Sequence, residues 1–248
     1  MRHEPIQVLS SALRPVPPGT VRPRLVIAGA TGALGNEVLR RLVGLQQFSS
    51  AQVLAREPIR AGLRGVGATV VPSDEPQDWP DGAADTGLVL FDPPRLFYDR
   101  ERALWTPTPQ QLPAIAQWMR RSGVATLAVV LPHAQGRLPE ALKQGLAGLD
   151  EQAVSALGFE RLLFIRSAQK PAAVRARGVL PRVADWMLSV TGYMVPSSEQ
   201  PVRAAKVAEL VALALQLAPP GIHVAAPEMV WQAAQGPMRP QVQRWLKV

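Results

Sequence analysis

Three glycines near the N-terminus have a spacing that favours phosphate binding. Within residues 24–42 (RLVIAGATGALGNEVLRRL) they form the pattern GxxGxxG. In a turn from strand to helix, one glycine permits a tight bend, a second lets the backbone approach a diphosphate, and a third lets the helix pack against the strand. The N–H groups at the helix start then attract the phosphates. We therefore predict a dinucleotide site formed by Gly29, Thr31, Gly32, Ala33, Leu34 and Gly35, and the alternative is a tight turn that binds nothing.

The residues after the second expected strand bear on which dinucleotide would bind. The residue about 20 positions beyond the glycines contacts the adenosine ribose, and an acid there suits NAD whereas an arginine suits the extra phosphate of NADP. Arg56 has this spacing, and Arg60 is close enough to share the phosphate. Glu57 is the competing acid, but it lies beyond the end of the strand. We therefore expect NADP rather than NAD, with an ordinary surface role for Arg56 as the alternative.

The framework for these residues follows from alternating apolar patterns. Short apolar runs typical of strands alternate with helical spacing of apolar residues. The expected strands are 24–28, 51–55, 68–71, 87–91, 125–131 and 162–165, and the expected helices are 35–43, 111–121 and 139–157. This alternation predicts an α/β fold, a doubly wound parallel sheet of Rossmann type.

The chain divides into three regions by composition. Residues 1–23 are rich in proline and predict an extended arm, and residues 24–170 hold the expected dinucleotide-binding core. Residues 171–248 begin with a loop-rich stretch, followed by an amphipathic helix at 202–217 and a strand at 221–225. We expect this third region to form a small C-terminal lobe packed on the core.

Composition excludes several classes of function. The 248 residues contain no cysteine, which rules out disulfides, thiolate metal sites and a cysteine nucleophile. His3, His133 and His223 are too far apart in the sequence to suggest a metal site. No apolar run is long enough for a membrane span or a secretory signal, so a cytoplasmic protein is expected. The net charge of +8 is scattered, which makes nucleic-acid binding an unfavoured alternative, and the oligomeric state stays open.

Three segments resemble the atypical short-chain dehydrogenase/reductase family, in particular the NAD(P)H-binding branch that includes the Tat-interacting-protein-like oxidoreductases. They are IAGATGALGNEVLRRL at 27–42, ALGFERLLFIRSAQ at 156–169, and PVRAAKVAELVALALQLAPPGIHVAAPEM at 201–229. The resemblance implies a Rossmann core, an NADP-type cofactor and a small substrate lobe. It also implies that Asp74, after the third strand, contacts the adenine, although a turn-forming aspartate is an equal alternative.

The catalytic set of that family is missing here. The resemblance would place a serine or threonine after the fifth strand, and a tyrosine and a lysine four residues apart on the next helix. The corresponding positions hold no hydroxyl after residue 131, and Lys143 and Ala147 on the helix, while the only tyrosines are Tyr98 and Tyr193. We expect another proton donor, for which His133, Lys143 and Tyr193 are the candidates, or a reaction needing no strong acid, or no catalysis.

A second departure follows the fourth strand, where relatives usually have small residues. The sequence there is Phe-Asp-Pro-Pro at 91–94, and we expect Asp92 to lie beside the cofactor. An aspartate near phosphates is unfavourable unless it faces a ribose hydroxyl. The following loop, 95–107, carries Phe97, Tyr98 and Trp105, and is expected to be either a lid over the nicotinamide or a surface loop anchored by its aromatic residues.

Together these features predict an NADP(H)-binding protein of reductase ancestry, with altered or absent oxidoreductase activity and an unknown small-molecule partner. The alternative is a non-catalytic interaction module on a Rossmann scaffold that uses the proline-rich arm and the basic tail at 239–248. A structure determined with the ligand in which the crevice at residue 32 is still filled by the protein's own atoms would contradict the first expectation.

Overall fold

A seven-stranded sheet organises the protein, and every strand pair in it is parallel. The computed structural model describes residues 22–59, 65–95, 98–131, 148–166 and 202–248. The strand order is β3-β2-β1-β4-β5-β6-β7. The strands are β1 (Arg24–Ala28), β2 (Ser50–Ala55), β3 (Val66–Val70), β4 (Thr86–Leu90), β5 (Thr126–Leu131), β6 (Arg161–Arg166) and β7 (Gly221–Ala225).

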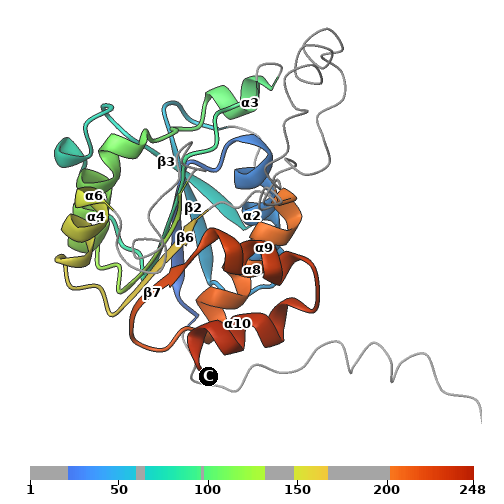
Figure 1. Ribbon diagram of the computed structural model, residues 1–248. Helices are drawn as coiled ribbons and strands as arrows, with labels where there is room; N and C mark the ends of the chain where they lie inside the picture. Colours follow the sequence, from blue (N-terminus) through green and yellow to red (C-terminus); the bar gives the residue numbers. More distant parts are fainter. Residues whose placement is uncertain (1–21, 60–64, 96–97, 132–147, 167–201) are drawn as a thin grey trace, which may run out of the picture.

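Helices cover both faces of this sheet (Figure 1). One face carries α2 (Gly32–Gly44), α8 (Ala204–Leu217), α9 (Pro227–Ala234) and α10 (Met238–Leu246). The other face carries α4 (Leu112–Arg121) and α6 (Leu149–Ser155). Three shorter elements connect them: η1 (Pro76–Asp78), α3 (Asp99–Arg102) and η2 (Pro109–Gln111). The prediction of a doubly wound α/β fold is confirmed.

The central strands are apolar throughout because both of their faces are buried. In β4, Leu88 and Leu90 point into the core on the α2 side, whereas Val89 between them points into the core on the α4 side. All three side chains are fully buried. Helix α2 contributes Val38, Leu39 and Leu42 to the first core, as their helical spacing predicts, and it begins at Gly32 rather than at residue 35.

The C-terminal region continues the same sheet and the same core. Strand β7 pairs with β6, α8 packs against α2, and α10 packs against α8. The indole N–H of Trp245 donates to the carbonyl oxygen of Val224 at 3.0 Å. The basic tail is therefore a packed helix over most of its length. The helix expected at 139–157 is described only from residue 148, where it forms α6.

The chain changes direction between β1 and β4. It runs outward from β1 to β3 and then returns to β4, which lies on the other side of β1. Such a switch point opens a crevice at the carboxyl ends of the two strands, where ligands of this fold class bind. At the opposite ends, the Arg24 guanidinium pairs with the Asp85 carboxylate at 3.0 Å. The hydrogen bond from Arg24 lowers the pKa of Asp85 below its usual value. None of the helices in the described parts of the chain is long and apolar enough to cross a membrane.

Candidate functional site

The glycine turn sits at this switch point, and its backbone requires glycine. Gly29 and Gly32 have φ of 81° and 68°, a region that other residues rarely adopt. A Cβ atom at Gly29 would lie 2.0 Å from the carbonyl oxygen of Leu90 on β4, and one at Gly35 would lie 2.7 Å from the carbonyl oxygen of Gly29. Backbone atoms therefore approach one another as closely at this turn as the pattern predicts for a diphosphate-binding loop.

Two main-chain amides of the turn bind carboxylate oxygens. The Gly32 N–H donates to Oε2 of Glu101 at 3.0 Å, and the Leu34 N–H donates to Oδ2 of Asp92 at 2.9 Å. A Cβ atom at Gly32 would lie 2.2 Å from that same Asp92 oxygen. The turn thus has the geometry of an anion cradle at a helix N-terminus, and the anions in it belong to the chain itself.

The carboxylate of Glu101 also binds Asn36 and Arg95. Its side chain accepts hydrogen bonds from Nδ2 of Asn36 at 2.7 Å, from the main-chain N–H of Arg95 at 2.9 Å and from Nε of Arg95 at 2.7 Å, and Nη2 of Arg95 completes an ion pair. The residue is only 4% exposed. Burial alone would raise the pKa of Glu101, but the hydrogen bonds from Arg95 and Gly32 bring it below its ordinary value. Glu101 is therefore ionised at neutral pH.

The main chain of Asp92 is also hydrogen-bonded to the turn. The buried Thr31 hydroxyl donates to the Asp92 carbonyl oxygen at 2.5 Å and lies 3.2 Å from the Thr106 hydroxyl. The Asp92 carboxylate takes one of the amide positions that the sequence assigns to phosphate, because the Leu34 N–H satisfies its charge there. Its position beside a bound cofactor stays a prediction.

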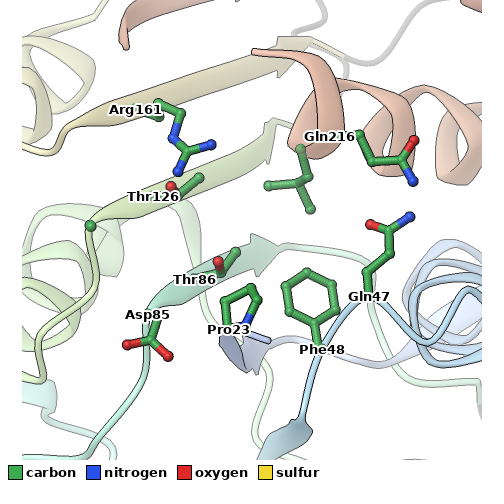
Figure 2. A pocket seen from close by; sticks show the side chains of 10 residues that line it. Pro23, Gln47, Phe48, Asp85, Thr86, Thr126, Arg161 and Gln216 are labelled. Atoms are coloured by element: carbon green, nitrogen blue, oxygen red, sulfur yellow. The ribbon is translucent and has the colours of Figure 1, made fainter. Parts of the chain in front are cut away.

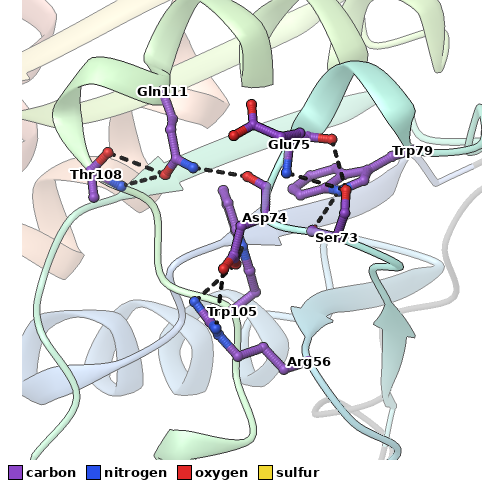
Figure 3. Close-up of polar contacts among 8 residues, drawn as sticks. All are labelled: Arg56, Ser73, Asp74, Glu75, Trp79, Trp105, Thr108 and Gln111. Atoms are coloured by element: carbon purple, nitrogen blue, oxygen red, sulfur yellow. Dashed lines mark hydrogen bonds and ion pairs between the residues drawn. The ribbon is translucent and has the colours of Figure 1, made fainter.

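The two residues expected on the adenosine side contact each other (Figure 3). Nη2 of Arg56 pairs with Oδ1 of Asp74 at 2.9 Å, and the indole N–H of Trp105 donates to the same oxygen at 2.9 Å. The Trp105 ring is 1% exposed and packs edge-on against Trp79, with ring centroids 4.7 Å apart. Asp74 and Arg56 therefore lie together after β3 and β2, with the Trp105 side chain against Asp74.

The residues around Trp105 cross the carboxyl end of β2. Leu104 forms an antiparallel bridge with Ala55, the Arg56 N–H donates to the carbonyl of Ala103 at 2.7 Å, and the Trp105 N–H donates to the carbonyl of Leu54 at 2.9 Å. Of the two expectations for this loop, anchoring by an aromatic residue holds for Trp105. The described part lies over the carboxyl end of β2 and the glycine turn, where the sequence predicts that the adenosine binds.

Several predicted site residues lie outside the described residues, namely Arg60, His133, Lys143 and Tyr193. The structure therefore brings together the glycine turn, Arg56, Asp74 and Asp92, and leaves the catalytic candidates as expectations. Sequence reasoning missed Glu101 and Asn36. Asn36 follows the third glycine directly, which was a usable signal, but nothing in the local sequence DRER at 99–102 distinguishes Glu101 from a surface acid.

Two cavities of about 380 Å³ each accompany this arrangement. The first adjoins the filled turn between α2, β2 and β3, and is bordered by Arg95, Tyr98 and Glu101. The second lies at the amino ends of the central strands (Figure 2), where Thr86, Thr126 and Arg161 face it beside Gln47 and Gln216. It contains none of the residues predicted for the dinucleotide.

Comparisons with known proteins identify the fold. No family model matches the chain, and no curated protein matches it. A nucleoside-diphosphate-sugar epimerase from Staphylococcus aureus has 11% identity and a TM-score of 0.50, over 86% of this chain and 77% of that one. The Bordetella bronchiseptica enzyme WbmG in complex with NAD has 14% identity and a TM-score of 0.44, over 89% of this chain and 81% of that one.

A third neighbour is the triphenylmethane reductase of a Citrobacter species, solved with NADP(H). It has 16% identity and a TM-score of 0.46, over 82% of this chain and 69% of that one. The likeness to the epimerase, together with the seven parallel strands and the helices on both faces, places this chain in the Rossmann fold.

Proposed function

We propose that this protein binds a nicotinamide dinucleotide, NADP(H) in preference to NAD(H), at the glycine turn. In this proposal it is a relative of the atypical short-chain reductases, close to the Tat-interacting-protein-like branch, with altered or absent oxidoreductase activity. A small molecule of unknown identity would bind beside the nicotinamide, with His133, Lys143 and Tyr193 as the candidates for moving a proton.

The observation that carries the proposal is the pair of amides at Gly32 and Leu34. Each already holds one anionic oxygen, at 3.0 and 2.9 Å. Two N–H groups directed at negative oxygens beside the N-terminus of α2 are what a diphosphate requires. The residue types of the turn therefore fit the diphosphate, and its present acidic contacts must be exchanged for the phosphates when the dinucleotide binds.

Arg56 supports the preference for NADP(H). Its guanidinium is half-exposed at the carboxyl end of β2, at the spacing from the glycines that suits a ribose phosphate. An arginine there attracts a phosphate, whereas the neighbouring Asp74 would repel one. We expect Arg56→Ala to weaken NADPH binding about tenfold or more and to leave NADH binding within about twofold, because NADH lacks the phosphate.

Thermal melting with each nucleotide tests the proposal. A hundredfold excess of NADPH over its Kd adds about 2.7 kcal/mol to the free energy of unfolding, which corresponds to a rise of about 5–10 °C in melting temperature for a chain of this size. Gly32→Val should abolish the rise. Gly65→Ala is the matched control, since Gly65 also has positive φ but no atom lies within 4 Å of its added Cβ. Unchanged melting with both nucleotides at millimolar concentration, in the wild type and in the folded variants that release Glu101, Asp92 or Trp105, would refute the proposal.

One observation favours a second candidate, a Rossmann scaffold that works without a dinucleotide. Glu101 is almost fully buried in the cradle and has five hydrogen-bonding or ionic contacts there. A carboxylate held this firmly would serve as a permanent part of the fold, and the protein would then act through its surface. The absence of nucleotide binding in every variant described below would favour this candidate.

A further inference from the structure

We infer that three side chains, Asp92, Glu101 and Trp105, act as an internal ligand that competes with the dinucleotide for its own site. We call these three side chains the internal ligand. The inference rests on the proposed function and concerns its regulation: the nucleotide binds only to a form of the protein in which these side chains have left the crevice.

The two carboxylates of the internal ligand each occupy one of the main-chain amides that would bind a phosphate oxygen. Glu101 accepts from the Gly32 N–H and Asp92 accepts from the Leu34 N–H. An amide N–H has one hydrogen to donate, so a phosphate oxygen cannot use these donors while the carboxylates hold them. Both carboxylates would also repel a diphosphate placed beside them in this partly buried crevice. Binding of the nucleotide and the present position of the acids therefore exclude each other.

Trp105 occupies the part of the proposed site where the adenosine would bind. Its planar ring lies at the carboxyl ends of β2 and β3, and its N–H takes an oxygen of Asp74 that a nucleotide base or ribose would otherwise meet (Figure 3). The ring is fully buried between the sheet and Trp79, so no second planar ring fits in its place. The internal ligand therefore resembles the adenosine diphosphate part of the dinucleotide. Its carboxylates correspond to the diphosphate, and the indole ring of Trp105 corresponds to the flat adenine base.

Glu101 is carried by a short helix and pairs with exposed side chains, whereas Trp105 belongs to the buried core and must be displaced from it. Helix α3 is a single turn, and Figure 1 shows it outside the two helical layers that cover the sheet. Arg95, the partner of Glu101, is 41% exposed, and Tyr98, on which its guanidinium stacks, is 51% exposed. Among the described residues after β4, Ala103, Leu104 and Trp105 bond to the carboxyl end of β2. The cavity of about 380 Å³ beside Glu101 leaves space into which side chains can move.

The internal ligand weakens nucleotide binding by an amount that depends on the open form, in which these three side chains have left the crevice. The apparent Kd equals the intrinsic Kd divided by the fraction of molecules that can bind. Minor forms of folded proteins are commonly populated at roughly 0.1–10%. An open fraction of about 1% would weaken NADPH binding about a hundredfold, and any change that releases the internal ligand would recover part of that factor.

The test is a titration of purified full-length protein with NADPH by calorimetry. Glu101→Gln and Asp92→Asn each remove one charge from the cradle, and Trp105→Phe removes the bond to Asp74 without changing any charge. We expect the two acid variants to bind NADPH at least tenfold more tightly than the wild type, and Trp105→Phe, which keeps most of the ring packing, about fivefold more tightly. Asp85→Asn is the matched control, because it also breaks an arginine–carboxylate pair but lies at the amino ends of the strands. It should bind NADPH as the wild type does.

Tryptophan fluorescence provides a second readout that needs no catalysis. If NADPH displaces Trp105 from its contact with Trp79, the emission of the wild type shifts to longer wavelength on binding, and Trp105→Phe removes most of that shift. The neutral Trp105→Phe variant also separates displacement from simple relief of charge repulsion, which only the acid variants would show. Circular dichroism confirms that each variant is folded.

The outcomes distinguish failure of the internal ligand from failure of the proposed function. Wild-type binding that is no weaker than that of Trp105→Phe and the acid variants would overturn the internal ligand and leave the proposed function standing. Binding of the wild type without a shift in emission would also overturn it. If none of the folded variants bound NADPH or NADH at millimolar concentration, the proposed function would fail and the internal ligand with it.

Discussion

Gly32 combines two constraints that can be separated experimentally. It has φ of 68°, and an added Cβ would also lie 2.2 Å from an Asp92 oxygen and 2.8 Å from the Pro93 carbonyl oxygen. Gly65 has φ of 82° with open space around it. The comparison therefore distinguishes backbone strain from steric crowding by the residues that follow β4.

We expect Gly65→Ala to lower the free energy of unfolding by about 1–2 kcal/mol, the cost of the left-handed conformation alone. Gly32→Ala should cost about 1–3 kcal/mol more, because Asp92 and Pro93 must move. Urea denaturation of both variants measures the difference. Equal losses would show that the residues after β4 yield freely to a methyl group.

Glu101 should make stability depend on pH in the acid range. Because its native pKa lies below the ordinary value of 4.5, its contribution to stability is fully present above that value and is lost as pH falls through the native pKa. Wild type and Glu101→Gln should therefore differ most in unfolding free energy near pH 6–7, and the difference should shrink below about pH 4.5. Denaturation curves at several pH values test this, and a difference independent of pH would contradict it.

At the scale of elements, Trp105 ties the residues after α3 to the turn after β3. Trp105→Phe keeps most of the ring packing and loses one hydrogen bond to a half-exposed carboxylate, so we expect a loss of about 1 kcal/mol in unfolding free energy. Trp105→Ala should cost about 3–5 kcal/mol through the cavity it leaves.

Trp118→Phe is the control for Trp105→Phe. Trp118 is also buried, and its indole N–H donates to the Pro80 carbonyl at 2.9 Å. Its stability loss should be similar, and its NADPH affinity should equal that of the wild type. A change of affinity in Trp118→Phe as large as in Trp105→Phe would indicate a general loosening of the tryptophan cluster.

Elements with a strong apolar period were predictable, and contacts between distant residues were not. Strand β1 and strand β7 have the predicted limits, and α2 and α4 differ from prediction by at most a few residues, because their apolar spacing is local information. The filling of the cradle depends on the hydrogen bond between Gly32 and Glu101, which are 69 residues apart. No local pattern specifies such a contact. Helices α9 and α10 were not predicted at all, since proline and polar residues interrupt their short apolar faces.

At the scale of the whole molecule, the C-terminal residues belong to the main core. Met238, Val242 and Leu246 of α10 are each buried. We expect Leu246→Ala to lower the free energy of unfolding by about 2–5 kcal/mol, whereas Arg244→Ala, at an exposed position of the same helix, should change it by less than about 0.5 kcal/mol. Thermal or urea unfolding gives both values, and a tail that served only as a free binding segment would show no loss for Leu246→Ala.

The ion pair between Arg24 and Asp85 has a practical consequence for protein engineering. It joins the bases of β1 and β4, and the parallel pairing of these strands continues up to Ala28 and Val89, so the two strands pair without help from residues 92–102. A designer could exchange residues 92–102 for a short glycine–serine connector and keep Leu104 and Trp105, which are buried in the core. The product would be a small Rossmann scaffold with a vacant amide pair, ready to accept a phosphorylated compound chosen at will.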